Sequence, residues 1–367
     1  MCNKLKGKHH EKPKLYYLLI SKLISSGLRP IIGIVLALII SAVMILASGV
    51  SPIVAYVALL QGAVGSIASF ANTCVRTSPL LLAGLGVAIG FKAGMLNVGP
   101  EGQIYAGAAA ATAIGLIPFS MPSWVHVIIC IFAGFLGGVV WALIPAYLRA
   151  YREVSEVVIT LMLNYIGIYF VSWLVHEPKL LFEKGAAYPQ SPLIMKSARL
   201  PILIKSTNLH VGILLGVFLA VLLYILLKHT SFGFKIRIVG ENPMAARYAG
   251  INVKKYLFTV MLISGGFGGL AGAVEILGLK LRLFDLFVSG VGYEAIAVAL
   301  LANCNFIGTI FSAFFFGALK AGATKMQIVS GIETSMALVV LSLALIFVIA
   351  MGFKNGKLFS IKKKANK

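Results

Sequence analysis

The chain has 367 residues, of which 59% are hydrophobic and only 12% are charged. Because an ordinary soluble domain carries about 25% charged residues, this composition excludes a soluble globular protein. The formal net charge is +21. The lysines and arginines are concentrated beside apolar stretches, which is typical of membrane topology and argues against nucleic acid as a partner.

Apolar stretches near the length that a helix needs to cross a hydrocarbon core of roughly 30 Å recur along the chain. They are continuous and do not alternate with period two, so we expect an all-α polytopic membrane protein. About ten transmembrane helices are predicted, at residues 31–50, 79–91, 98–116, 125–148, 157–175, 211–227, 256–277, 291–301, 307–319 and 336–351. Residues 51–78 are less apolar and suit an outer-surface or re-entrant helix, so nine or eleven spans remain alternatives.

The basic residues predict one topology. Seven Lys/Arg fall in the first 30 residues, six in residues 228–255 and six after Met351. Since Lys and Arg near span ends stay in the cytoplasm, both termini are expected there, and the basic blocks also favour anionic lipid headgroups. The expected organisation is a basic cytoplasmic segment 1–30, one transmembrane domain 31–353 with a cytoplasmic loop 228–255 and a main outer loop 176–207, and a basic cytoplasmic tail 354–367.

A glycine-rich segment with several polar residues, GFKAGMLNVGPEGQIYAGAAA, spans residues 90–110. It lacks the GxxxxGK[ST] pattern of a phosphate-binding loop. Asn97, Glu101 and Gln103 lie where the span 98–116 begins. A glutamate is stabilised at a helix N-terminus, but it is costly in hydrocarbon unless it is paired or hydrated. These residues therefore either secure a helix start or line a path for a polar solute.

Asn164, with Tyr165 beside it, lies well inside the span 157–175. An amide at that depth requires hydrogen-bond partners, which a neighbouring helix or a polar solute could supply. The spans 79–91 and 291–301 are short and interrupted by glycine, and broken helices often mark the solute path of a transporter.

The sequence holds no motif for covalent chemistry. Its six histidines and four cysteines form no HExxH or CxxC arrangement, and no nucleophile elbow is present. We therefore expect no catalytic residue and no metal site, and interpret the chain as a non-enzymatic protein.

The cytoplasmic loop contains a short helix that is well marked by its end residues. Asn242 can cap the helix, Pro243 suits its first turn, and Gly250 follows its end at Tyr248. A rigid capped helix in a long cytoplasmic loop suits a docking element for a soluble partner, and the alternative is an ordinary connector.

Four segments resemble the permease subunits of ABC importers in the ribose/nucleoside branch: GFKAGMLNVGPEGQIYAGA, SEVVITLMLNY, TSFGFKIRIVGENPMAARYAGI and GYEAIAVALLANCNFIGTIFSAFFFGAL. They keep the order and spacing of that branch over roughly residues 30–350. The forms GMLNVGPEGQ and MLNY are most similar to permeases of purine or general nucleoside importers that work with a receptor of the basic-membrane-protein type.

The resemblance implies a type II importer fold in the cytoplasmic (inner) membrane of a bacterium. It implies ABC ATPase subunits that bind ATP and Mg²⁺, a second, usually dissimilar, permease subunit and an extracytoplasmic solute-binding lipoprotein. This chain would hold no cofactor and would form the path for nucleosides, in particular purine nucleosides. Riboflavin or a monosaccharide such as ribose is the alternative solute, and an ion-coupled secondary transporter is the alternative mechanism.

The resemblance also assigns residues to two regions. The solute path is expected to include Asn97, Glu101, Gln103, Asn164 and Tyr165. The helix that couples to the ATPase is expected to include Glu241, Asn242, Pro243, Ala245, Ala246, Arg247, Gly250 and Ile251.

Overall fold

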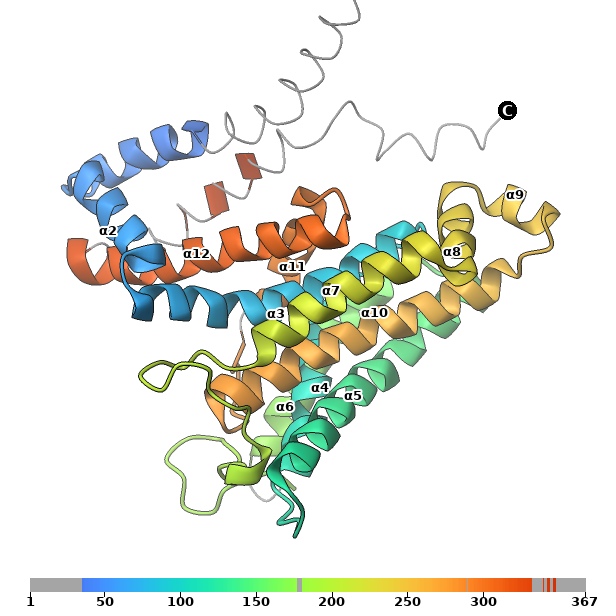
Figure 1. The fold of residues 1–367 in the computed structure, drawn as a ribbon, viewed down its shortest axis with the longest axis horizontal. Helices are drawn as coiled ribbons and strands as arrows, with labels where there is room; N and C mark the ends of the chain where they lie inside the picture. Colours follow the sequence, from blue (N-terminus) through green and yellow to red (C-terminus); the bar gives the residue numbers. More distant parts are fainter. Residues whose placement is uncertain are drawn as a thin grey trace, which may run out of the picture.

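The computed structural model describes residues 35–176, 180–288 and 290–331, with a few further positions between 339 and 347. The basic segment 1–30, the tail 354–367 and most of the expected span 336–351 lie outside the described residues. The regular secondary structure of the described residues consists of helices and two isolated β-bridges, joined by loops (Figure 1). After a helix at Val35–Ala47, the elements are α2 (Pro52–Val64), α3 (Ile67–Lys92), α4 (Pro100–Gly115), α5 (Ser123–Arg152), α6 (Glu156–Val175), η1 (Lys196–Ala198), α7 (Gly212–His229), α8 (Ser231–Glu241), α9 (Pro243–Tyr248), α10 (Val253–Glu275), η2 (Ile276–Lys280), α11 (Val291–Leu301) and α12 (Phe306–Ser330).

The expected fold class, about ten transmembrane helices in a type II importer arrangement, is wrong in its helix count. Among the described residues, six helices are long and apolar enough to cross a membrane: α3, α5, α6, α7, α10 with η2, and α12. The 11 residues of α11 extend about 16 Å, at 1.5 Å per residue, which is too short to span the hydrocarbon core. The 16 residues of α4 are also few, and most of them are buried by other helices.

The boundary of α3 also differs from the expected span 79–91. The helix begins at Ile67 and continues through Pro79 without interruption, after Ser66 accepts a 3.0 Å hydrogen bond from the Ser69 amide. A proline removes one helical hydrogen bond, but burial can offset that loss. Because the apolar part of α3 is 89% buried by protein, the sequence before Pro79 does not need the uniformly apolar composition of a lipid-facing helix.

Glycines bring α10 into close contact with α4 and α5. A Cβ atom at Gly138 in α5 would lie 2.1 Å from the Gly265 carbonyl oxygen, and one at Gly107 in α4 would lie 2.3 Å from Gly269. Small residues at such positions let helix backbones approach one another in a membrane. This packing buries α4 between its neighbours and holds the polar start of that helix inside the protein.

The two ends of the helical bundle carry different elements. Figure 1 shows α8 and α9 at one end and the long connection between α6 and α7 at the other. That connection is joined to η2, which continues α10, by a backbone hydrogen bond from Leu200 to Leu277, and to the residue after η2 by one from Ile194 to Leu281. The end of α10 therefore lies beside the connection that we expect to be the main outer loop.

Candidate functional site

The start of α4 is held by a network of neutral polar side chains. The Asn97 amide nitrogen donates to Gln103 Oε1 at 3.1 Å and to Ser264 Oγ of α10 at 2.8 Å. The Asn97 Oδ1 atom accepts from the Gly99 amide at 2.9 Å. The Ser264 hydroxyl in turn donates to the Gly86 carbonyl of α3. Three helices thus meet through this buried network.

Asn164 makes a second connection between helices. Its Oδ1 atom accepts from the Gly102 amide at 2.9 Å, and its amide nitrogen donates to the Val98 carbonyl at 2.9 Å and the Tyr293 hydroxyl at 3.2 Å. The side chain therefore joins α6 to α4 and α11. The neighbouring Tyr165 is 60% exposed, so its side chain does not take part in this buried connection.

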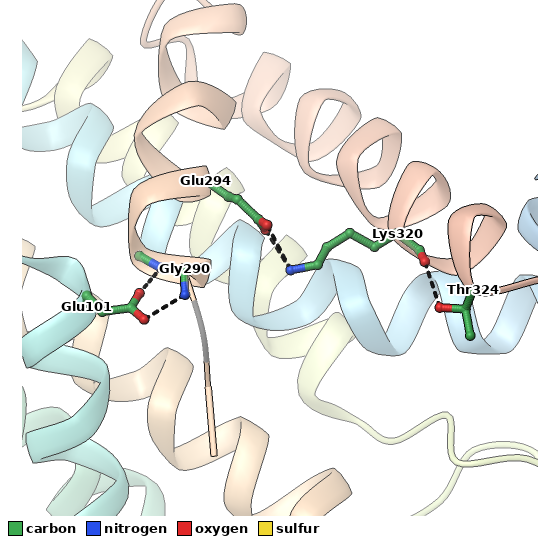
Figure 2. A network of polar contacts seen from close by, with 6 residues as sticks. Glu101, Gly290, Glu294, Lys320 and Thr324 are labelled. Carbon is green, nitrogen blue, oxygen red and sulfur yellow. Dashed lines mark hydrogen bonds and ion pairs between the residues drawn. The ribbon is translucent and has the colours of Figure 1, made fainter. Parts of the chain in front are cut away.

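Glu101 fixes the beginning of α11 (Figure 2). Its two carboxylate oxygens accept hydrogen bonds from the amides of Gly290, at 2.8 Å, and Gly292, at 2.6 Å. These amides lie at the N-terminus of α11, where the first N–H groups of a helix have no partner within the helix. A carboxylate at this position is also stabilised by the helix dipole.

The structure brings four of the five expected path residues together inside the protein. Asn97, Glu101, Gln103 and Asn164 are buried, and their side chains form hydrogen bonds within the chain. These hydrogen bonds connect α4 with α6, α10 and α11 and so hold the four helices together. Their contact with a solute remains a prediction.

Glu294 of α11 forms an ion pair that was not foreseen. Its carboxylate oxygens lie 2.8 and 2.9 Å from Lys320 Nζ of α12, and Lys320 also accepts, through its backbone carbonyl, a hydrogen bond from Thr324 (Figure 2). The sequence feature that could have predicted this pair is Lys320, because a lysine within an apolar stretch is expected to pair with an acidic residue.

The predicted short helix in the cytoplasmic loop is confirmed as α9. Asn242 Oδ1 accepts from the amides of Met244 and Ala245, both at 3.1 Å, and Gly250 adopts the left-handed conformation with φ +73° after the helix end. Ala246 is fully buried against Val239 and Val253, which anchors α9 to α8 and α10.

The outer surface of α9 displays residues that the sequence analysis did not single out. Met244 is 56% exposed and Tyr248 is 88% exposed. Beside the helix lies a groove of about 510 Å³, lined by Glu153, Arg247, Gly250, Ile251, Asn252, Val253 and Lys254. An apolar tip next to a polar groove can bind a protein partner.

Within the described ranges, no group of three His, Cys, Asp or Glu side chains is placed to hold a metal ion.

Residues 69–349 match the protein family described as "Branched-chain amino acid transport system / permease component". The chain belongs to this permease family. It is a multi-pass membrane protein and the permease subunit of an ABC transporter.

Relatives of this permease have names that specify different solutes. The guanosine ABC transporter permease protein NupP of Bacillus subtilis is 35% identical over 94% of this chain and 99% of its own length. The nucleoside ABC transporter permease protein NupB of Lactococcus lactis is 33% identical, covering 89% of this chain and 91% of its own length. The glucose ABC transporter permease protein TsgB13 of Haloferax volcanii is 30% identical, covering 88% of this chain and 87% of its own length.

Proposed function

We propose that this permease forms the translocation path of an ATP-driven importer of nucleosides, in particular purine nucleosides. The observation that carries the proposal is the similarity to the guanosine permease over 94% of the chain, supported by a nucleoside permease at 33% identity. The glucose permease is somewhat less similar, at 30% identity, so a monosaccharide is the second candidate solute.

The proposed complex contains partner subunits that supply the energy and the solute. ABC ATPase subunits bind ATP and Mg²⁺ and hydrolyse the nucleotide. A second permease subunit, a dissimilar paralogue, completes the path, and a solute-binding lipoprotein delivers the nucleoside from outside. The permease lies in the cytoplasmic (inner) membrane with both termini in the cytoplasm, an orientation supported by the basic residues of the α8–α9 region.

The docking role falls to α9 and the residues around it. Anchoring of Ala246 between α8 and α10 makes α9 move with the transmembrane helices, and its exposed tip is available to the ATPase. Closure of the ATPase on ATP would then be transmitted along α10, which begins directly after this loop and packs against α3, α4 and α5.

Reconstitution of the whole complex in liposomes tests the proposed function. We expect uptake of radiolabelled guanosine that requires the ATPase, ATP and the lipoprotein, and that unlabelled nucleosides inhibit. Inhibition by glucose, ribose or riboflavin but not by nucleosides would contradict the solute assignment. Uptake without the ATPase, or uptake abolished by a protonophore while ATP is present, would contradict the ATP-driven mechanism.

A further inference from the structure

A polar cavity of about 210 Å³ lies among α3, α10 with η2, α11 and α12. It is separate from the buried networks around Asn97 and Asn164. Its lining consists of Asn72, Arg76, Pro79, Glu275, Leu279, Lys280, Val291 and Lys320. Four of these eight side chains are ionisable, although all of them belong to or adjoin helices of a membrane protein. Charged groups at such positions are costly and usually mark a solute or ion path.

Glu275 is the unpaired acid of this cavity. No hydrogen bond or ion pair joins its carboxylate to any residue in the described part of the chain, and Lys280, Lys320 and Arg76 belong to the lining of the same cavity. The neighbouring Glu294 behaves differently, because it forms a closed ion pair with Lys320 at 2.8 Å (Figure 2). The Glu275 oxygens therefore remain available to a molecule in the cavity.

Arg76 of α3 supplies a donor group to the lining of the same cavity. Its Nε atom is buried and has no hydrogen-bond partner among the described residues, and its Nη2 atom makes one long contact of 3.4 Å with Thr324 Oγ1. A guanidinium carries five N–H donors and no acceptor, so it suits the oxygen and nitrogen acceptors of a ligand. The lining of the cavity thus contains both an acceptor, Glu275, and a donor, Arg76.

The cavity lies close to the connection between α6 and α7, which we expect to be the main outer loop. Glu275 and Lys280 lie where α10 ends, next to the backbone hydrogen bonds that join Leu277 to the connection between α6 and α7. Val291 begins α11, the short helix that Glu101 caps. Interrupted helices around a polar cavity are a recurring arrangement in transporter binding sites.

We infer that this cavity binds the solute through Glu275, whose carboxylate accepts hydrogen bonds from the vicinal hydroxyls of a ribose, while Arg76 donates to acceptor atoms of the same solute. The inference rests on the proposed nucleoside transport and deepens it by naming the site. Carboxyl oxygens accept hydrogen bonds, and a vicinal diol presents two O–H donors to them. The volume is smaller than that of a complete ligand pocket, as expected if it holds one polar end of the solute.

The test compares ribonucleosides with deoxygenated analogues in the reconstituted complex. For the wild type, we expect the KM of guanosine uptake to be roughly tenfold lower than that of 2′,3′-dideoxyguanosine, because the analogue lacks both donors. For Glu275→Gln, the KM of guanosine should rise about tenfold, while the KM of the dideoxy analogue should stay within about twofold of the wild-type value. The matched control is Glu183→Gln, which alters a glutamate paired with Arg282 outside the cavity and should leave both KM values unchanged.

Each outcome has a defined consequence. If Glu275→Gln raises the KM of guanosine and of the analogue equally, Glu275 acts on the structure and the inference is wrong. If Glu275→Gln does not assemble, the wild-type comparison decides, since equal KM values for guanosine and its dideoxy analogue contradict the diol contact. Absence of uptake of any nucleoside by the wild-type complex overturns the proposed function and with it the inference, whereas nucleoside uptake with unchanged mutant KM overturns the inference alone.

Discussion

The Gly292 amide donates a 2.6 Å hydrogen bond to Glu101 Oε2, joining two residues that are 191 positions apart in the chain. Together with the bond from Gly290, it fixes the start of α11 against the start of α4. A Cβ atom at Gly292 would lie 2.2 Å from the Glu101 backbone nitrogen, so the contact also depends on the absence of a side chain there. One carboxylate thus joins the starts of two helices that lie far apart in the chain.

Replacing Glu101 should weaken this contact. In Glu101→Gln, one oxygen becomes an NH₂ group that faces a backbone N–H, so one hydrogen bond is lost and its donor remains unpaired. We expect a loss of roughly 2 kcal/mol in the free energy of unfolding. The loss should appear as a lower midpoint in thermal unfolding of the detergent-solubilised protein. The control Glu153→Gln changes an exposed glutamate, and equal midpoints for the two variants would contradict the capping role.

Asn164 should be more sensitive than the tyrosine that follows it. Asn164→Leu leaves the Gly102 amide and the Val98 carbonyl without their partner, which is expected to cost about 2–4 kcal/mol. Tyr165→Phe should be neutral because Tyr165 is 60% exposed. The measurement is again the unfolding midpoint, at equal expression. A stable Asn164→Leu variant would show that other contacts hold α6 to α4.

Two variants of α9 should separate docking from folding of the helix. Tyr248→Asp alters an 88% exposed side chain and should reduce co-purification of the ATPase without lowering the thermal stability of the permease. Ala246→Asp places a charge in a fully buried site and should reduce both the co-purification of the ATPase and the thermal stability of the permease. The exposed variant Lys184→Gln, in the connection between α6 and α7 at the other end of the bundle, serves as a surface control. Full ATPase binding by Tyr248→Asp would exclude the tip of α9 from the interface.

His210 should make stability fall in mild acid. Its buried ring accepts a 3.2 Å hydrogen bond from the Gly212 amide at Nδ1 and packs against Gly278, and burial lowers the pKa of His210 from 6.5 to about 4. The unfolded chain therefore binds the proton first as pH falls. The contribution of the neutral ring is complete above pH 6.5 and is lost between pH 6.5 and about 4, by up to about 1.4 kcal/mol per pH unit.

Unfolding midpoints at pH 7.5 and pH 5 measure this dependence. His210→Asn keeps an acceptor near Nδ1 but cannot titrate, so its midpoint should be lower at pH 7.5 and should change less on acidification. An equal change for the variant and the wild type would assign the acid sensitivity to other groups.

Local sequence signals were sufficient for α9 and insufficient for α3 and α11. Asn242, Pro243 and Gly250 define the ends of α9 through contacts within a few residues. The start of α3 was misplaced because the residues before Pro79 are less apolar than those after it and were assigned to a separate outer-surface or re-entrant helix, whereas α3 begins at Ile67. The count of ten spans failed because apolar composition does not distinguish a helix that crosses the membrane from one, such as α11, that is short and buried.

The sequence by itself determined that this protein is helical and resides in a membrane, because composition, run length and the distribution of Lys and Arg act over neighbouring residues. The tertiary structure decided what the buried polar residues do. Glu101 and Asn164 find partners in distant parts of the chain, whereas Glu275 and Arg76 line a cavity with unused hydrogen-bonding capacity. Such pairings depend on how helices pack in three dimensions, which the local pattern of one sequence does not specify.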